Sequence, residues 1–253
     1  MVMGRSVAAI VLLLSVLGCA FSAPNSKARI VGGQDTTIEQ HPYQVSLHHG
    51  GTHSCGGSIL SVNTILTAAQ CVSANEEPND YSIRAGSTAR NEGGQLVTVT
   101  QIFIHPNYID ASLQWDLAVL KLSVDLVLGQ SVQPIALPSS TLKVPHGTVA
   151  SIAGWGSLYH KGPSTNILQQ VSVPVVENGV CSLALQNFGS IWSFNLCAGA
   201  FGVDACQGDS GGPLVLDGAV IGVASWGYGC GFDGYPAVYS RVSEFIDFIT
   251  QYL

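Results

Sequence analysis

Short apolar runs separated by turn residues limit this chain to a fold built from many brief strands. Val, Ile and Thr dominate these runs, and several alternate apolar and polar residues with a period of two, which is typical of strands. The runs cover residues 43–48, 58–67, 95–104, 117–122, 148–155, 170–175, 213–216 and 219–226. Because no helical segments stand between them, the sequence predicts an all-β barrel or sandwich.

One helix is expected, at the C-terminus. Val242, Phe245, Ile246 and Ile249 fall at positions i, i+3, i+4 and i+7 and therefore share one apolar face. Ser243 is expected to cap this helix through its hydroxyl group. We expect the helix to be structural.

The first residues of the chain indicate a secretory leader. An apolar run over 7–17 is broken only by a serine, and it is shorter than the roughly twenty residues that span a bilayer. Gly18 and Ala20 place small residues at the −3 and −1 positions of a cleavage site. We therefore predict a signal peptide over 1–20 and a secreted, extracellular protein. A buried helix and a bacterial lipoprotein box around Cys19 are the alternatives.

The cysteine count fits a secreted chain. Cleavage after residue 20 removes one of the seven cysteines, Cys19, and leaves an even number, which indicates three disulfides. No C-x-x-C pair is present, so zinc ligation is not indicated. Spacing alone leaves the pairing open among Cys55, Cys71, Cys181, Cys197, Cys206 and Cys230.

The charge balance argues against several classes of partner. The formal net charge is −7, and without residues 1–29 six Lys and Arg face sixteen Asp and Glu, a net charge of −10. Such a chain is a poor ligand for nucleic acid or an anionic membrane. Hydrophobic residues make up 47% of the sequence, which is enough for a sizeable core and excludes general disorder.

A glycine-rich turn around Ser210 is the most informative motif. In G-D-S-G-G, residues 208–212, the glycines let backbone N–H groups converge beside the serine hydroxyl, as a nucleophile with an oxyanion hole requires. The related elbow of α/β-hydrolases needs an acid and then a histidine after the serine. The last histidine of this chain is His160, so that fold is excluded.

From Ile30 to the C-terminus, the chain resembles the trypsin-like (chymotrypsin-fold) serine proteases, and most of all the arthropod digestive type. The shared motifs are R-I-V-G-G (29–33), C-G-G-S (55–58), T-A-A-Q-C (67–71), D-L-A-V (116–119), G-W-G (154–156), the segment 204–213 and S-W-G (225–227). The resemblance implies one domain over 30–253, with two antiparallel six-stranded β-barrels, a cleft between them and a C-terminal α-helix. It also implies the disulfides Cys55–Cys71, Cys181–Cys197 and Cys206–Cys230.

The same resemblance implies a zymogen with an activation propeptide over 21–29. A trypsin-like protease would cleave after Arg29 and free the amino group of Ile30. That ammonium group would pair with Asp209, because a buried ammonium requires a carboxylate partner. The pairing would order the specificity pocket and the oxyanion hole, which is formed by the N–H groups of Gly208 and Ser210.

Several residues of this chain match positions of the family's specificity pocket. Asp204 matches the carboxylate at its base, which selects Arg or Lys, and Gly227 matches one wall. Ala237 stands where the family usually has a second wall glycine, so we expect its methyl group to narrow the pocket. Ser225 matches a residue that lines the substrate-binding strand and supports the catalytic acid, Asp116.

The catalytic histidine of the family is replaced by Gln70. A general base must titrate near the working pH, and a glutamine amide does not. Gln70 can accept a hydrogen bond from Ser210 but cannot carry its proton away, and loss of one member of such a triad can cost about 10⁶ in turnover. No histidine of the chain stands at a triad position, and we expect all seven to be solvated loop residues, namely His41, His48, His49, His53, His105, His146 and His160.

No metal or cofactor is expected. Ser87 stands at the first ligand position of the family's calcium loop, and Glu92 is the only acid in that segment.

These features predict a non-catalytic serine protease homologue that acts by binding, as a regulator, a cofactor of an active protease or a decoy. Its expected partners are proteins or peptides that present Arg or Lys, active proteases and protease inhibitors, and the chain is expected to be a monomer. The alternative is an active or weakly active trypsin-like endopeptidase, if Gln70 is an allele or a reading error, or if a substrate histidine serves as the base. A storage protein would leave the retained Arg29, Asp204, Asp209 and Ser210 unexplained.

Overall fold

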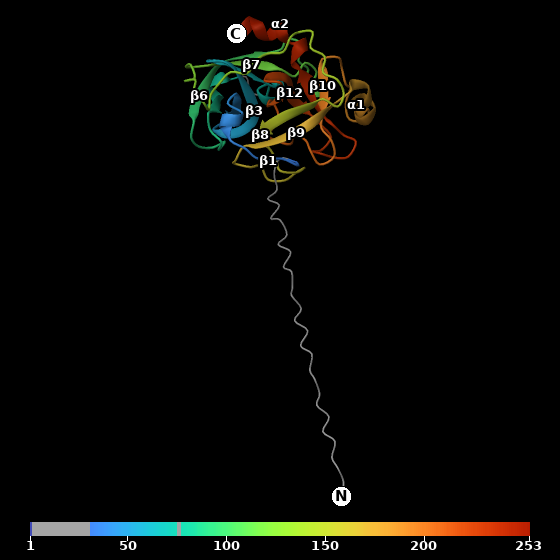
Figure 1. The fold of residues 1–253 in the computed structure, drawn as a ribbon. Coiled ribbons are helices and arrows are strands. Elements are labelled where there is room, and N and C mark those ends of the chain that lie inside the picture. The colour runs from blue at the N-terminus through green and yellow to red at the C-terminus, as the bar shows by residue number, and fades with distance from the viewer. Residues whose placement is uncertain (2–30, 75–76) are drawn as a thin grey trace.

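Two β-barrels lie side by side in the computed structural model, which describes Met1 and residues 31–74 and 77–253 (Figure 1). The leader and propeptide expected over 1–29, apart from Met1, and the new N-terminus expected at Ile30 lie outside the described residues. None of the helices in the described part of the chain has the length and apolarity needed to span a bilayer.

The first barrel is a closed ring of six antiparallel strands in the order β2-β3-β4-β7-β6-β5. Alternate side chains such as Val45, Leu47 and Ile83 are buried inside it, as the period of two requires. Its strands are β2 (Gln44–His49), β3 (Thr52–Ser61), β4 (Thr64–Thr67), β5 (Tyr81–Ala85), β6 (Gln95–Ile104) and β7 (Ala118–Leu122).

The second barrel is closed because β8 pairs with both β9 and β11. A two-residue strand, β1 (Gln34–Asp35), adds to β9 outside the ring. The remaining strands are β8 (Val149–Gly154), β9 (Gln169–Val176), β10 (Asn195–Ala198), β11 (Pro213–Leu216), β12 (Ala219–Trp226) and β13 (Ala237–Arg241). The two six-stranded barrels expected from the resemblance are thus confirmed.

Helices are few among the described residues. The C-terminal helix is confirmed but short, with α2 (Ile246–Ile249) between single 3-10 turns, and Phe245 and Ile249 are buried. The predicted cap is wrong: Phe245 is the N-cap of α2, and Ser243 is a buried residue of the preceding 3-10 turn. The 3-10 turns are η1 (Ile38–Gln40), η2 (Ala69–Cys71), η3 (Pro78–Asp80), η4 (Asp110–Ser112), η5 (Val242–Glu244) and η6 (Thr250–Tyr252).

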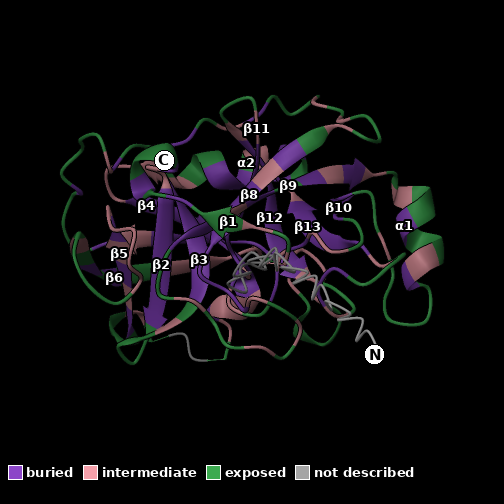
Figure 2. Cartoon of the chain, turned by 60° about the horizontal axis from the view of Figure 1, so that its bottom comes forward, coloured by how far each residue is buried: buried purple, intermediate pink, exposed green. Residues whose placement is uncertain are grey.

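Three disulfides fix segments that the barrels leave outside. The pairs are Cys55–Cys71, Cys181–Cys197 and Cys206–Cys230, as the resemblance implies. The second pair ties α1 (Asn178–Leu185), a helix that the sequence did not predict, to β10. In Figure 2 the strands are largely buried and many loops are exposed, whereas α1 has exposed residues on one side and buried ones on the other.

The two barrels share an apolar cluster. Leu66 and Leu117 from the first half of the chain pack with Val215 and Val223 from the second half, together with C-terminal side chains such as Phe245. This contact brings the segments around Asp116 and Ser225 together, although they are more than a hundred residues apart in sequence.

Candidate active site

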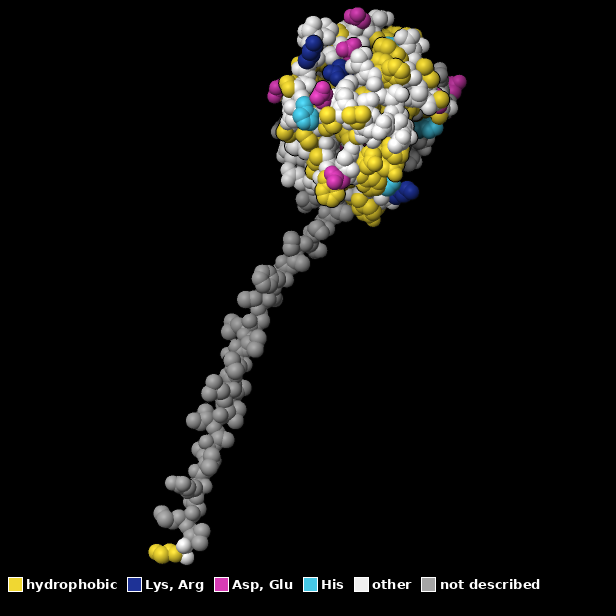
Figure 3. Space-filling model, turned by 90° about the vertical axis from the view of Figure 1, so that its right-hand side faces the viewer, with side chains coloured by type: hydrophobic (Ala, Val, Ile, Leu, Met, Phe, Trp, Pro, Cys, Tyr) yellow, Lys and Arg dark blue, Asp and Glu magenta, His cyan; other side chains and the backbone are white. Residues whose placement is uncertain are grey.

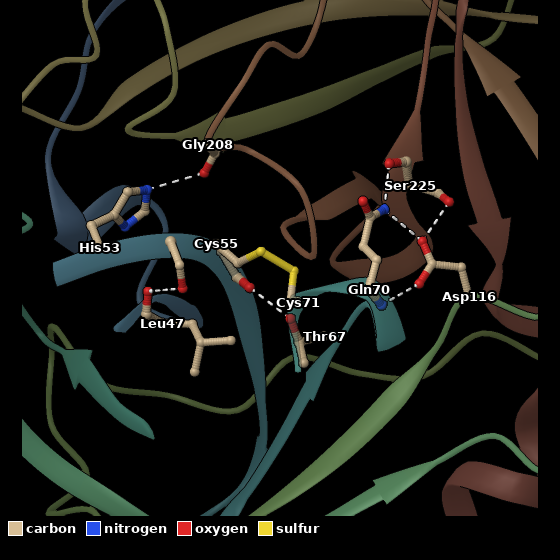
Figure 4. The surroundings of a disulfide bond; sticks show 11 residues. Leu47, His53, Cys55, Thr67, Gln70, Cys71, Asp116, Gly208 and Ser225 are labelled. Atoms are coloured by element: carbon tan, nitrogen blue, oxygen red, sulfur yellow. Dashed lines mark hydrogen bonds between the residues drawn. A yellow bond between two sulfur atoms is a disulfide. The ribbon is translucent and has the colours of Figure 1, made fainter. Parts of the chain in front are cut away.

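Gln70, Asp116 and Ser225 form a compact hydrogen-bonded group at the junction of the barrels (Figure 4). The Gln70 backbone N–H donates to Asp116 Oδ1 at 2.9 Å, and its side-chain Nε2 donates to Asp116 Oδ2 at 2.7 Å. The same Nε2 donates to the Ser225 carbonyl at 2.5 Å. The Ser225 hydroxyl completes the group by donating to Asp116 Oδ2 at 2.6 Å.

These donors explain how Asp116 can be fully buried. Burial raises the pKa of this carboxyl group, while the hydrogen bonds from Ser225 and Gln70 oppose the rise without cancelling it. A buried carboxylate without such partners costs several kcal/mol. Gln70 therefore stabilises the acid that a catalytic histidine would otherwise contact.

The orientation of the Gln70 amide is fixed by its neighbours. Asp116 Oδ2 and the Ser225 carbonyl can both only accept, so the group that faces them must be the NH₂ and not the oxygen. Both amide protons are engaged in this way. Gln70 and Ser210 line the same cavity, yet no hydrogen bond joins their side chains in the described part of the chain.

The turn that carries Ser210 leaves two backbone amides free. Gly208 and Gly211 adopt left-handed φ values of +96° and +78°, which glycine allows at little cost. The Ser210 carbonyl accepts from the Gly56 N–H at 2.7 Å, which fixes the turn against β3. Among the described residues, the N–H groups of Gly208 and Ser210 have no acceptor, so they can serve an anionic oxygen.

His53 supports this turn, a role that sequence reasoning missed. Its Nε2 donates to the Gly208 carbonyl at 3.1 Å, and its Nδ1 accepts from the Ser46 hydroxyl at 2.7 Å. Burial lowers the pKa of His53 to about 4, so the imidazole is neutral at pH 7. With both nitrogens engaged, His53 positions the Gly208 peptide and has no nitrogen left to act as a base for Ser210.

The prediction that every histidine is a solvated loop residue is wrong. His41 and His48 are 6% and 3% exposed, and His53 is half-buried. His41 lies in the bend that ends η1, and its Nε2 contacts Gln170 Oε1 at 2.7 Å. His48 lies on β2, and its Nε2 contacts the Arg90 carbonyl at 3.1 Å. Their contacts depend on distant segments, which local sequence does not reveal.

Asp209 is a buried carboxylate held by two backbone amides. Its Oδ1 accepts from the Gly156 N–H at 2.9 Å and its Oδ2 from the Cys206 N–H at 3.0 Å. A side chain at Gly154 or Gly156 would collide with this carboxylate, which explains both glycines of the G-W-G motif. Burial raises the pKa of Asp209 to about 6, and no cation pairs with it among the described residues.

Val31, where the described residues begin again after Met1, lies close to a second buried acid, Asp204. The Val31 carbonyl accepts from the backbone N–H of Asp204 at 3.3 Å, and Gly231 leaves room for the Val31 side chain. Asp204 in turn lies near enough to Asp209 that the charge of Asp209 contributes to raising its pKa. The segment that follows Ile30 is thus anchored beside Asp204.

A cavity of about 240 Å³ opens beside Ser210. Of the predicted pocket residues it is lined by Ser225, Gly227 and Ala237, whereas Asp204 is not among its lining residues. The other lining residues are Gln70, Ala205, Cys206, Gln207, Ala224, Trp226, Gly229, Cys230 and Val238.

Asp204 is nearly sealed from this cavity. Its side chain is 2% exposed, and only Oδ2 has a partner, the Gly231 N–H at 2.9 Å. Asp204 Oδ1 and the nearby Tyr239 hydroxyl are buried with no hydrogen-bond partner in the described structure. Burial is the main reason that the pKa of Asp204 rises to about 7. The carboxyl group of Asp204 is therefore only partly ionised at neutral pH, and Ala237 lines the cavity that adjoins it.

Comparison with known proteins agrees with this geometry. A family model described as Trypsin matches residues 30–249. Trypsin delta of Drosophila melanogaster is 41% identical, over 92% of this chain and 94% of its own length. Trypsin 5G1 of Aedes aegypti is 38% identical, over 91% and 87%. The vitellin-degrading protease of Bombyx mori is 37% identical, over 96% and 93%.

Gln70→Ala tests the structural role of the amide. The substitution removes the side-chain donor to buried Asp116 and to the Ser225 carbonyl, so we expect a loss of about 1–3 kcal/mol in the free energy of unfolding. Urea denaturation measures it. Gln133→Ala, at an exposed side chain, is the control and should change little. Equal stability of the Gln70→Ala protein and the unmodified chain would contradict the account.

Ala237→Gly tests whether the Ala237 methyl group limits the access of a ligand cation to Asp204. Removal of one methyl group should tighten the binding of an aromatic amidinium ion about tenfold or more, because the cation can then approach the carboxylate. Isothermal titration calorimetry gives the affinity, and Ala224→Gly removes a methyl group elsewhere in the same cavity as the control. If both variants bind like the unmodified chain, Ala237 is not the barrier.

Proposed function

The chain belongs to the trypsin family of serine proteases, and on that premise we propose that it is a secreted, non-catalytic homologue that acts by binding. One observation carries the proposal. The side chain at the general-base position is an amide whose NH₂ group is committed to Asp116 and the Ser225 carbonyl. An amide does not titrate near neutral pH, so the Ser210 proton has no acceptor on the enzyme.

The retained binding features support a role that needs recognition without cleavage. The free amides of Gly208 and Ser210 can hold a peptide carbonyl, and the adjoining cavity can take a side chain. A peptide carbonyl held there is stabilised, but no base starts the attack on it. The partner is a polypeptide that presents Arg or Lys to the cavity, and the chain acts as a regulator, a cofactor of an active protease or a decoy.

We further propose that cleavage after Arg29 switches this binding site on. Asp209 is buried, and its two amide donors leave acceptor capacity for a cation. The anchoring of Val31 beside Asp204 supports the arrival of an ammonium group from the preceding residue. An activating trypsin-like protease is the implied partner for this step.

A working endopeptidase is the second candidate. It is favoured by the retained Ser210 and Asp116, by the free amides of the turn, and by relatives that are themselves named trypsins. A histidine on the substrate beside the scissile bond would then have to accept the Ser210 proton. Peptides with and without such a histidine distinguish this route from the non-catalytic one.

Gln70→His tests the missing base directly. In protein cleaved after Arg29, we expect the variant to hydrolyse Arg and Lys ester and amide substrates at least about 10³-fold faster than the unmodified chain, because the triad is restored. Gln70→His combined with Ser210→Ala is the control and should be inactive. Unmodified protein that matches the variant in turnover would overturn the proposal.

If the new N-terminal ammonium group pairs with Asp209, the gain in stability on cleavage after Arg29 depends on pH. In the uncut chain the pKa of Asp209, about 6, lies above its ordinary 3.8, so stability falls as the pH rises between these values, because the unfolded state loses its proton first. An ammonium partner removes this loss. Cleavage should therefore stabilise the protein by about 2–3 kcal/mol more at pH 7.5 than at pH 4.

Thermal unfolding of cut and uncut protein at both pH values measures this difference. Asp209→Asn is the matched control, in which cleavage should have the same effect at pH 4 and at pH 7.5. An equal gain at both pH values in the unmodified chain would show that Asp209 does not receive the new terminus.

A further inference from the structure

A second cavity opens on the second barrel, where β9 ends and α1 begins. Its volume is about 510 Å³, which is large enough for a small organic molecule. In Figure 3, which shows the side of the molecule that carries α1, basic and acidic side chains lie close together near the top. None of the residues that line this second cavity also lines the cavity beside Ser210. It is therefore a separate site from the cleft of the proposed function.

The most buried residues that line the second cavity are apolar. Val175 of β9 and Leu196 of β10 are each only 1% exposed. Leu142 and Val144, which also line it, are half-buried and pack against the same core cluster. An apolar group that enters the cavity leaves water for these contacts, which is favourable in proportion to the area that it buries. The inner part of the cavity therefore suits an apolar side chain.

Arg241 provides a fixed cation in the wall of the second cavity. Its Nε and Nη2 donate to the Asn195 carbonyl at 3.1 and 2.9 Å, and Nη2 also donates to Asn178 Oδ1 at 3.3 Å. Asn178 itself lines the cavity, so the guanidinium end of Arg241 lies at the wall together with its stem. Its Nη1 has no acceptor among the described residues. A positioned N–H donor with a full positive charge thus remains for a ligand.

Glu244 provides the opposite charge at the same cavity. It ends the 3-10 turn η5, of which Arg241 is the N-cap residue, and residues three apart in such a turn lie on the same side. Burial lowers the pKa of Arg241, and the charge of Glu244 partly opposes this, so the two groups lie close enough to interact. They nevertheless form no ion pair in the described part of the chain. A ligand that carries both charges can bridge them.

A second pair of opposite charges, Lys143 and Glu177, lines the cavity as well, and both side chains are exposed. The lining thus carries two cations and two acids, which cancel, although the chain after residue 29 has a net charge of −10. A site with balanced charges favours neither a simple anion nor a simple cation. It favours a molecule that is neutral as a whole and charged at two points.

We propose that this cavity binds a small zwitterion with an apolar side chain, either a free amino acid or a dipeptide. The carboxylate of the ligand accepts from Arg241 Nη1, and its ammonium group pairs with Glu244. The apolar side chain packs against Leu142 and Val175 in the inner part of the cavity. The inference is independent of Gln70 and of the cleft.

Calorimetric titration of the full chain tests the site, with L-leucine and leucyl-leucine as the probes. We expect saturable binding of one molecule per chain. N-acetyl-leucine lacks the ammonium group and leucinamide lacks the carboxylate, so each should bind at least about tenfold more weakly than L-leucine. Glycine keeps both charges without the apolar side chain and should also bind more weakly. Tighter binding of leucyl-leucine than of L-leucine assigns the ligand to a dipeptide, whereas equal or weaker binding assigns it to the free amino acid.

Substitutions locate the binding in this cavity. Glu244→Gln, at an exposed position, should weaken the binding of L-leucine about tenfold and leave that of N-acetyl-leucine unchanged. Asp247→Asn removes an exposed acid that does not line the cavity, and should leave the affinity within about twofold. Arg241→Gln should weaken L-leucine and leave leucinamide unchanged. Because Arg241 also holds Asn178 and Asn195, Glu244→Gln decides the outcome if the Arg241→Gln chain does not fold.

Three results would overturn the proposal. The unmodified chain binds neither L-leucine nor leucyl-leucine, or it binds L-leucine, N-acetyl-leucine and leucinamide equally well, so that the charges of the ligand are not recognised. In the third, the Glu244→Gln chain binds L-leucine like the unmodified chain, which would place the binding elsewhere.

Discussion

A carboxylate that is buried without partners costs several kcal/mol, and this chain buries three of them around one site. Asp116 is satisfied by Gln70 and by the Ser225 hydroxyl. Asp209 is held by two backbone amides, one at each oxygen, whereas Asp204 accepts from the Gly231 N–H at Oδ2 and its Oδ1 has no partner among the described residues. The completeness of each set of donors determines what each acid can still bind.

The three buried carboxylates therefore differ in what each can still bind. Both oxygens of Asp116 accept hydrogen bonds, and Gln70 supplies two of the donors at the position where the family places a base. Asp209 and Asp204 keep acceptor capacity, which suits an ammonium group and a ligand cation respectively. His53 keeps the Ser210 turn in place without acting as an acid or a base. In the proposed function, a site of this kind recognises a peptide and lacks the step that would cut it.

Much of the fold could be predicted from local sequence, because strands with β-branched residues between turns carry a strong signal. The runs at 95–104, 213–216 and 219–226 coincide with β6, β11 and β12. The single run at 58–67 divides into β3 and β4, because a turn at 62–63 interrupts it. Strands β5, β10 and β13 were missed: they are short, and polar residues such as Arg84 dilute their apolar pattern.

The sequence predicts which residues form the site but not the hydrogen bonds between them. Gln70, Asp116 and Ser225 stood out by motif, yet the direction of the amide depends on acceptors 46 and 155 residues away. The local sequence did not predict the role of His53 or the helix α1. His53 acts through its hydrogen bond to the distant Gly208 carbonyl, and α1 is tied to β10 by the Cys181–Cys197 disulfide. Long-range contacts of this kind are set by the closed barrels and not by neighbouring residues.

The rate at which an activated ester acylates Ser210, followed from pH 5 to pH 9, tests the central claim most directly. The measurement is made on Asp204→Asn protein, because the Asp204 carboxyl group has a pKa of about 7 and would itself titrate in this range. With no titrating base beside the serine, the logarithm of the rate should rise steadily with pH and show no inflection between pH 6 and pH 8. A plateau governed by a group of pKa near 7 in this variant would contradict the account, because it would reveal a working base at this site.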